Sequence, residues 1–233
     1  MFIIEGNIGT GKTTMLEAIK KYIPQLSVQI ESVASWQVKS NGASILQQFY
    51  DQPERWAYTM EISSLTTRIP EHYALQEKKE LVHVIERSIY SGFHCFAYND
   101  YKSKFLQKIE WEIFKQWFDF AIRGCETPQG FIYLQAEPAV SFERAKARAR
   151  SEEATISLDY ITQIHERHED FLIHKRNIHN SIKDCPVLVL DCNQDFTLDS
   201  AVLEINIQKI KQFILESCSH FQEQQQATDL CQI

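Results

Sequence analysis

The chain has 233 residues, of which 44% are hydrophobic and 24% charged, a composition that excludes an intrinsically disordered protein and fits one large folded domain. Its 24 basic and 31 acidic residues give a net charge of −7 without a basic stripe, which argues against a nucleic-acid partner. No apolar stretch is long enough to predict a membrane span, and six cysteines without a C-x-x-C pair are typical of reduced thiols.

Strands and helices are predicted to alternate along the chain. Short apolar or β-branched runs predict five buried strands, at residues 2–5, 27–30, 81–85, 130–134 and 186–190. The spacing of Met15, Leu16, Ile19 and Ile23 predicts a helix that ends at Pro24. Longer amphipathic segments follow at about 43–78, 89–122, 138–180 and 198–216. This alternation predicts an α/β fold, with a parallel sheet covered by helices on both faces.

The domain organisation is predicted to be simple, because no repeat and no Gly/Ser/Pro-rich linker divides the chain. Residues 1–216 are expected to form one domain, and residues 217–233 a polar C-terminal tail. Since the first strand is predicted to begin at Phe2, no leader peptide is expected, and the predicted location is cytoplasmic.

A phosphate-binding loop is predicted near the N-terminus. Three of the seven glycines, Gly6, Gly9 and Gly11, lie within the first eleven residues. The segment fits G-x-x-x-x-G-K-[ST] between a strand and a helix. Glycines let N–H groups turn inward to bind an anion, Lys12 adds a positive charge, and the Thr13 hydroxyl can bind Mg²⁺. The motif predicts a nucleotide site at Gly6, Asn7, Ile8, Gly9, Thr10, Gly11, Lys12, Thr13 and Thr14; the alternative is a glycine-rich turn without a ligand.

Three later segments indicate which class of nucleotide-binding protein the chain resembles. Glu86-Arg87-Ser88 follows the third predicted strand, Arg144, Arg148 and Arg150 precede Glu152-Glu153, and Asn193-Gln194-Asp195-Phe196 follows the last strand. In this order they resemble the deoxynucleoside kinases, in particular the deoxycytidine, deoxyguanosine and insect multisubstrate group, over about Phe2 to Phe196. Thymidylate kinase is the nearest alternative, but it is not expected to carry the Glu-Arg-Ser and Asn-Gln-Asp-Phe segments together. GTPase switches are disfavoured because neither Asp-x-x-Gly nor Asn-Lys-x-Asp occurs.

The resemblance implies a P-loop kinase with a five-stranded parallel sheet, and it assigns catalytic roles. Glu31 matches the carboxylate that takes the proton of the 5′-hydroxyl, although Ser32 stands where the family usually has proline. Arg87 matches the arginine near the 5′-oxygen. Glu86 matches a ligand of Mg²⁺ or of a water molecule, and Thr13 is the other expected metal ligand. Residues 144–154 match an arginine-rich lid over the donor phosphates, which implies catalytic roles for Arg148 and Arg150 and ATP contacts for Arg144 and Arg148. Asp195 and Phe196 match a loop that contacts the donor adenine. A solvated basic helix is the alternative for the lid.

The resemblance also implies a nucleoside pocket. Tyr50 and Glu153 match the pair that holds the sugar 3′-hydroxyl, while Trp36 and Phe96 match the aromatic walls of the base slot. Core packing is the alternative for these aromatic residues.

At the base edge the chain departs from the family. Met60-Glu61 replaces Phe-Gln, and Gly92 replaces the aspartate partner of Arg68. An ionised Glu61 only accepts hydrogen bonds and, with Arg68, favours guanine, whereas a protonated Glu61 would mimic glutamine and admit cytosine or adenine.

The predicted function is ATP- and Mg²⁺-dependent phosphorylation of the 5′-hydroxyl of a deoxynucleoside, with a purine preference. The resemblance also implies a homodimer formed by helices around residues 43–69 and 108–124. Two alternatives stay open, a nucleoside-monophosphate kinase of the thymidylate kinase type and a non-catalytic nucleotide-binding protein.

Overall fold

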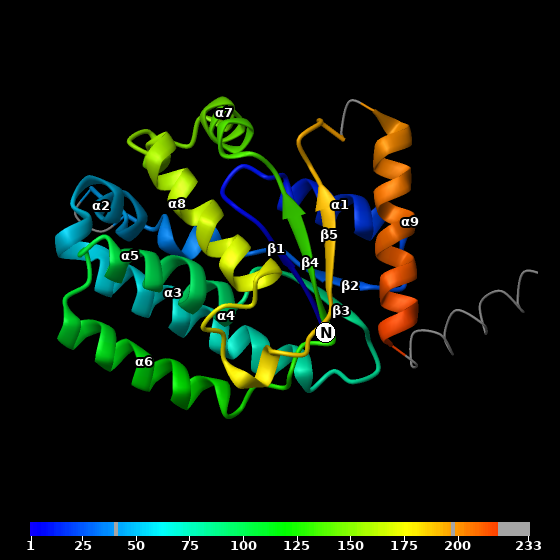
Figure 1. Cartoon of the computed structure of the whole chain (residues 1–233), viewed down its shortest axis with the longest axis horizontal. Coiled ribbons are helices and arrows are strands. Elements are labelled where there is room, and N and C mark those ends of the chain that lie inside the picture. The colour runs from blue at the N-terminus through cyan, green and yellow to red at the C-terminus, as the bar shows by residue number, and fades with distance from the viewer. Residues whose placement is uncertain (40–41, 197–198, 219–233) are drawn as a thin grey trace, which may run out of the picture.

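Five parallel strands form one sheet through the middle of the structure (Figure 1). The computed structural model describes residues 1–39, 42–196 and 199–218. Its strands pair in the order β2-β3-β1-β4-β5, and they are β1 (Phe2–Glu5), β2 (Ser27–Gln29), β3 (His83–Glu86), β4 (Gly130–Gln135) and β5 (Val187–Asp191). The predicted α/β fold with a five-stranded parallel sheet is confirmed.

The helices are shorter than the predicted amphipathic segments. They are α1 (Lys12–Tyr22), α2 (Ile45–Asp51), α3 (Pro53–Gln76), α4 (Ile89–Ser91), α5 (Tyr98–Lys102), α6 (Lys108–Ile122), α7 (Pro138–Arg148), α8 (Leu158–His168) and α9 (Ser200–Ser217). The segment predicted at 43–78 divides before Pro53, because proline lacks the N–H that a helix interior needs and suits a first turn. Two π-helical segments, Gly92–Ala97 and Glu169–Ile173, adjoin α4 and α8.

Alternate strand residues bury the two faces of the sheet in different cores. Ile3, Ile85 and Phe131 pack with apolar side chains of α3, α4 and α6. Phe2 and Ile4 face the opposite side, where α1 and α9 cover the sheet (Figure 1). This period of two follows from the pleat of a strand, in which successive side chains point to opposite faces.

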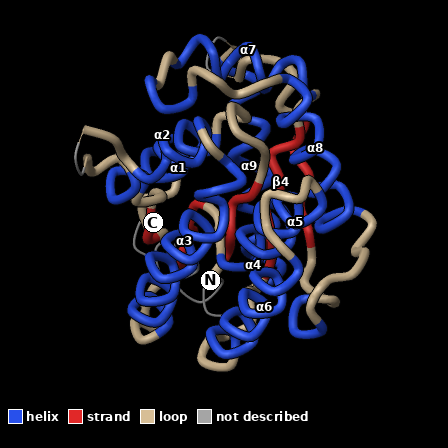
Figure 2. Tube along the Cα trace, turned by 90° about the vertical axis from the view of Figure 1, so that its left-hand side faces the viewer, coloured by secondary structure: helices blue, strands red, loops and turns tan. Residues whose placement is uncertain are grey.

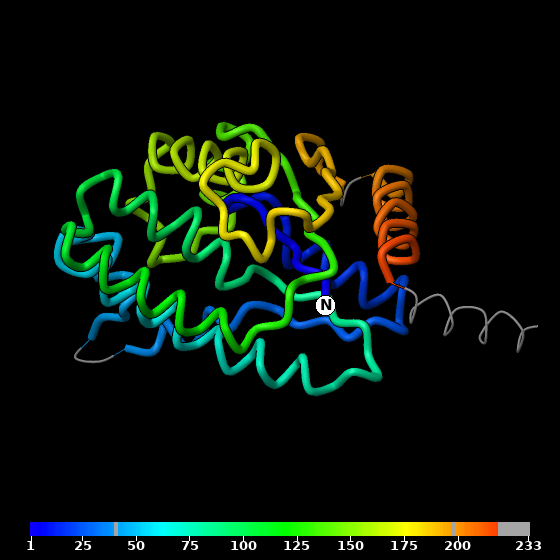
Figure 3. Tube along the Cα trace, turned by 60° about the horizontal axis from the view of Figure 1, so that its bottom comes forward, coloured from blue at the N-terminus to red at the C-terminus, as the bar shows by residue number. Residues whose placement is uncertain are grey.

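Helices α3 and α6 run side by side on one face of the sheet (Figures 2 and 3). Helix α3 has 24 residues and reaches beyond the sheet to α2, with which it packs. The side chains of Glu61, Ser64 and Arg68 are buried on α3, although each is polar. Buried polar groups need partners, so this face of α3 belongs to a site rather than to an apolar core.

The C-terminal part of the described chain is helix α9, which ends at Ser217 with Cys218 buried beside it. Residues 219–233 of the predicted tail lie outside the described residues. Within the described ranges, no helix has both the length and the apolar character needed to cross a membrane.

The loop after β1 lies against helix α7. Gly9 has a φ of +87°, and a Cβ atom built there would lie 2.1 Å from the backbone oxygen of Ser141. Gly42 has nearly the same φ, +89°, but no atom lies within 4 Å of its Cβ position. The two glycines therefore share a backbone requirement and differ in the space around them.

We predict that Gly9→Ala destabilises the protein by more than Gly42→Ala. Both substitutions place alanine at positive φ, which costs about 1–2 kcal/mol. Only Gly9→Ala also forces the loop away from α7, which adds about 1–3 kcal/mol of overpacking. Urea unfolding of both variants measures the difference, and equal losses would show that the loop does not need this close contact.

Candidate active site

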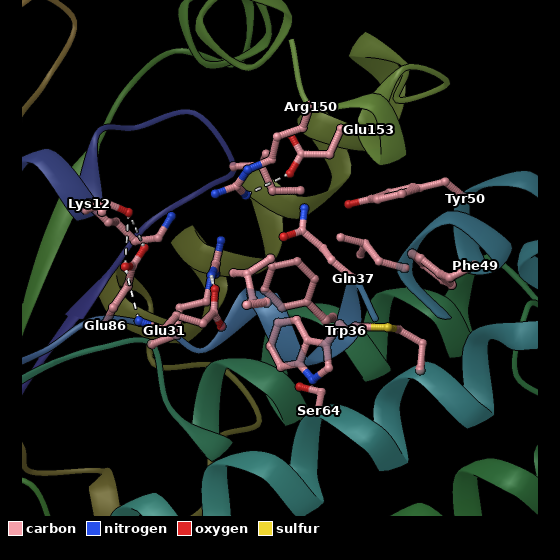
Figure 4. A pocket seen from close by; sticks show the side chains of 18 of the residues that line it. Lys12, Glu31, Trp36, Gln37, Phe49, Tyr50, Ser64, Glu86, Arg150 and Glu153 are labelled. Carbon is pink, nitrogen blue, oxygen red and sulfur yellow. Dashed lines mark hydrogen bonds and ion pairs between the residues drawn. The ribbon is translucent and has the colours of Figure 1, made fainter. Parts of the chain in front are cut away.

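A cavity of about 280 Å³ opens at the carboxyl ends of the strands (Figure 4). In parallel sheets this edge is where ligands bind. The cavity brings together most of the predicted site residues, namely Ile8, Lys12, Thr13, Glu31, Trp36, Tyr50, Glu61, Arg68, Glu86, Arg87, Phe96, Arg148, Arg150 and Glu153. Residues that are up to 145 positions apart in the sequence therefore line one space.

The phosphate loop has the backbone expected of an anion nest. Gly6, Gly9 and Gly11 all have positive φ, and helix α1 begins directly after them. The Lys12 ammonium is buried and donates to the Asn7 carbonyl at 2.7 Å. Burial, together with the positive charge of Arg87, lowers the pKa of Lys12 to about 7. A bound anion would reverse that shift, so the loop is electrostatically suited to phosphate.

Two oxygen-bearing side chains face each other beside Lys12. The Thr13 hydroxyl lies 3.2 Å and 3.1 Å from the two carboxylate oxygens of Glu86. Glu86 also accepts from the backbone N–H of Glu31 at 3.4 Å, so it connects the ends of β2 and β3 (Figure 4). A hydroxyl and a carboxylate next to a phosphate loop are the ligand types that Mg²⁺ uses.

The side chains of the Glu86-Arg87-Ser88 segment contact three different partners, with Glu86 beside Thr13, Arg87 beside Glu31 and Ser88 beside Glu5. Arg87 has a φ of +61°, a conformation rare for a residue with a side chain. Its N–H donates to the Ile4 carbonyl, and its guanidinium turns toward Glu31 and the ring of Phe96, 4.7 Å from the ring centroid. Ser88 caps helix α4 and donates to the buried Glu5 at 2.7 Å. The strained Arg87 is thus held by its own backbone hydrogen bond to β1 and by the hydrogen bond of the next residue, Ser88, to Glu5.

Glu31 is a largely buried carboxylate, with 10% of its side chain exposed, and it is held by two arginines. Arg68 donates to Oε1 in a charge-assisted hydrogen bond, and the Arg87 Nε lies 3.6 Å from Oε2. Burial alone would raise the pKa of Glu31, but the two guanidinium charges outweigh it and hold the pKa below its ordinary value. Glu31 is therefore ionised at neutral pH. Ser32, where the family usually has proline, donates to Glu71 of α3 at 2.7 Å.

The predicted lid closes on Glu153. Helix α7 ends at Arg148, and Ala149 turns the chain with a φ of +53°. Arg148 and Arg150 then both bind Glu153, at 2.6 Å and 3.2 Å. The phenol of Tyr50 points toward the same carboxylate (Figure 4). Burial, and then the charge of Glu153, raises the pKa of Tyr50, which stays a neutral donor.

Arg68 does not lie where the guanine hypothesis needs it. That hypothesis directs Arg68 at the base together with Glu61, whereas the structure directs it to Glu31 and to the Ser64 hydroxyl at 2.5 Å. Its guanidinium also lies over the ring of Trp36, 5.2 Å from the centroid. Gly92 carries no side chain that could hold Arg68 elsewhere, and a Cβ there would lie 3.0 Å from its Nη1.

Nine residues predicted to bind ATP lie outside the lining of this cavity. Six of them belong to the phosphate loop and the start of α1, namely Gly6, Asn7, Gly9, Thr10, Gly11 and Thr14. The other three lie further along the chain. Arg144 donates to the carbonyls of Cys192 and Asn193, at 2.6 Å and 3.0 Å, and so ties α7 to the loop after β5. Phe196 is buried against Gly11, behind the phosphate loop, and Asp195 next to it is exposed. The predicted contacts of Arg144 with the donor phosphates, and of Asp195 and Phe196 with the donor adenine, stay predictions.

Asp100 and Tyr160 are parts of the site that the sequence analysis missed. Tyr160 of α8 lines the cavity, and its ring lies 6.2 Å from that of Tyr50. Asp100 of α5 is fully buried behind the cavity. Ser157, whose hydroxyl caps α8, is a sequence signal for the start of the helix that carries Tyr160. It does not indicate that Tyr160 lines the site. Nothing in the sequence around Asp100 distinguishes it from a solvated helix carboxylate.

Comparison with known proteins agrees with this geometry. A family model described as Deoxynucleoside kinase matches residues 2–215. The chain is 33% identical to Deoxycytidine kinase 2 of Gallus gallus and 32% identical to Deoxycytidine kinase of Homo sapiens, over 91% of this chain and 89% of each relative. It is also 32% identical to mitochondrial Deoxyguanosine kinase of Xenopus laevis, over 91% of this chain and 88% of that relative.

We predict that Arg68→Met shifts the acid limb of the pH–rate profile to higher pH. Removing Arg68 leaves burial to raise the pKa of Glu31 against only Arg87 and the more weakly acting Lys12, so Glu31 loses its charge at a higher pH. The measurement is kcat/KM between pH 4.5 and 8. Arg55→Met, which removes an exposed arginine from the same helix, serves as the control. An acid limb that stays in place would mean that Arg68 does not set the charge of Glu31.

Proposed function

Because the chain belongs to the deoxynucleoside kinase family and is thus a phosphotransferase of nucleoside salvage, we propose that ATP is its donor and the 5′-hydroxyl of a deoxynucleoside its acceptor. One observation carries this proposal. The phosphate-loop Lys12 and the ionised Glu31 line a single cavity, with Arg87 between the loop and the carboxylate. A nucleoside with its 5′-hydroxyl at Glu31 would thus meet the phosphate site.

Proton transfer and charge stabilisation fall to separate groups. Glu31 is ionised at neutral pH, so it can accept the proton of the 5′-hydroxyl as that oxygen attacks phosphorus. Lys12, Arg148 and Arg150 supply positive charge to the oxygens of the transferred group. Phosphoryl transfer gains most of its acceleration from such positioning and electrostatics.

The Thr13 hydroxyl and the Glu86 carboxylate fit a Mg²⁺ ion that also binds the donor phosphates. Both are hard oxygen ligands, they lie within 3.2 Å of each other, and Mg²⁺ is commonly held by one or two protein oxygens together with phosphates. When bound, the ion neutralises charge on the phosphate oxygens.

The nucleoside is proposed to lie between Trp36 and Phe96. The neutral Tyr50 phenol can donate to the sugar 3′-hydroxyl and Glu153 can accept from it, which would fix the orientation of the sugar. A purine preference stays a proposal that depends on the charge of Glu61. The predicted cytoplasmic location also stays a prediction, since one relative is named as mitochondrial.

A direct assay separates this function from its two rivals. ADP release is measured with MgATP alone, with each of the four deoxynucleosides, and with thymidine monophosphate. Release stimulated by a deoxynucleoside supports the proposal, whereas stimulation by the monophosphate alone supports a thymidylate kinase type of activity. No stimulation by any acceptor would support a non-catalytic protein.

We predict that Glu31→Gln lowers kcat by roughly 10²- to 10⁴-fold, the range for loss of a general base. Nucleoside binding should change little, because glutamine keeps the shape and one acceptor. Isothermal titration with the best deoxynucleoside and steady-state kinetics measure the two effects. Glu204→Gln, an exposed residue of α9, is the control. A loss of less than tenfold would remove Glu31 from the role of base.

The homodimer is proposed to use an exposed apolar face of α6. Ile109, Ile113, Trp117 and Phe120 recur at helical spacing, and each is more than one third exposed, up to 66% for Phe120. Monomeric proteins rarely leave such a continuous apolar stripe in water. This helix lies within the segment 108–124 that the resemblance implies for a dimer.

We predict that Trp117→Lys converts the dimer into a monomer, because a buried, unpaired charge opposes association. Sedimentation velocity of the wild type and the variant measures the mass of each. Asp119→Lys, two residues further along and outside the stripe, should leave the dimer intact. A wild-type monomer, or equal masses for all three proteins, would contradict this interface.

A further inference from the structure

Glu61, at the base end of the cavity, and Asp100 close to it are buried carboxyl groups with oxygens that lack a hydrogen-bond partner within the described part of the chain. Glu61 of α3 lines the cavity and is 5% exposed, and Asp100 of α5 is fully buried. Among the described residues, Oε2 of Glu61 and both carboxyl oxygens of Asp100 have no hydrogen-bond partner. A buried carboxylate without donors is strongly disfavoured, and such a group takes up a proton instead.

The only cation that acts on Glu61 among the described groups is engaged elsewhere. Arg68 lies on the same helix, two turns away, but one arm of its guanidinium binds Glu31 and the other binds Ser64. Its Nε is buried without a partner, so none of its nitrogens donates to Glu61. The ion pair that keeps Glu31 charged thus leaves Glu61 without a hydrogen bond from Arg68, and the charge of Arg68 opposes the effect of burial on the pKa of Glu61 only in part.

No other titratable group that the structure describes around Glu61 supplies a positive charge, and Asp100 opposes its ionisation. Asp100 faces it from α5, and a negative charge on Glu61 raises the pKa of Asp100, which burial has already raised. Tyr160 faces it from α8, and burial keeps that phenol neutral. Leu65 and Phe114, which line a small gap beside Glu61, are apolar. Two close carboxyl groups cannot both be ionised cheaply, so the pair retains at least one proton.

We propose that Glu61 is a specificity residue whose effect depends on its proton. At neutral pH it contacts the base as a neutral carboxylic acid, and when it loses its proton to solvent the preference of the enzyme shifts toward guanine. This inference rests on the proposed function and concerns the same cavity. It changes the guanine hypothesis in one respect, because the guanine preference becomes a property of alkaline pH.

The chemistry of the base edges sets the direction of the shift. A neutral carboxyl offers one donor and one acceptor, like the glutamine of the resembling kinases, and it can match an edge of cytosine, adenine or guanine. An ionised carboxylate offers acceptors only. Cytosine presents a ring nitrogen acceptor beside its amino group and loses a partner, whereas guanine presents a ring N–H beside an amino group and keeps two.

Internal competition between two substrates tests the proposal. Deoxyguanosine and deoxycytidine are mixed in one reaction with MgATP, and the ratio of the two monophosphates formed gives the ratio of their kcat/KM values. Changes that both substrates share, such as titration of Lys12 or Glu31, cancel in this ratio. The reaction is run at half-unit steps from pH 6.5 to 8.5, with the wild type and with Glu61→Gln.

The expected result is a rise in the guanine-to-cytosine ratio of at least about fourfold in the wild type. Burial raises the pKa of Glu61 to about 8, so its neutral fraction falls to about a quarter at pH 8.5. The Gln variant, which is always neutral, should show a ratio that does not change with pH.

A wild-type ratio that is constant or falls with pH overturns the proposal, and so does an equal rise in the Gln variant. If the variant does not fold, the wild-type ratio still decides. These outcomes differ from failure of the proposed function, in which neither monophosphate forms at any pH.

Discussion

The rest of the site depends on one buried carboxylate held between two arginines. Glu31 follows β2, Arg87 follows β3, and Arg68 comes from α3, so this ion pair joins two strand ends to the helix that covers them. A buried charge is tolerated only when it is paired and hydrogen-bonded. The same contacts that make Glu31 tolerable in the interior keep it ionised and able to accept a proton.

That ion pair also organises the charges at both ends of the cavity. At the phosphate end, burial and then the charge of Arg87 lower the pKa of Lys12, so a bound anion would stabilise the charged form of Lys12 there. At the base end, Arg68 binds Glu31 and does not donate to Glu61, whose Oε2 has no hydrogen-bond partner among the residues that the structure describes. The cavity is therefore polarised, with one end suited to a multiply charged anion and the other to a neutral base.

The sheet and the phosphate loop could be predicted because their signals are local. Apolar runs and glycines determine β1 and the loop after it, and the parallel strands bring Glu31 and Glu86 to the same edge. The π-helical segment Gly92–Ala97 was not predicted, since it has the same apolar periodicity as a helix. The roles of Arg68 and Asp100 depend on which groups lie nearby in space, and neither spacing nor resemblance encodes that.

The departures from the family pattern gather on the nucleoside side of the cavity. Lys12, Thr13, Glu86 and Arg87 keep the pattern around the phosphates, whereas Ser32, Glu61 and Gly92 break it around the acceptor. Each departure acts on the same network: Ser32 binds Glu71 of α3, Gly92 leaves Arg68 without an alternative anion, and Arg68 then binds Glu31 rather than Glu61. The change from glutamine to Glu61 alters almost no volume, yet it makes the pattern of donors and acceptors depend on a proton. Burial raises the pKa of that group, and the charge of Arg68, about two helical turns away, opposes this only in part because its guanidinium binds Glu31 and Ser64. Base recognition here is therefore a property of the network and not of one residue.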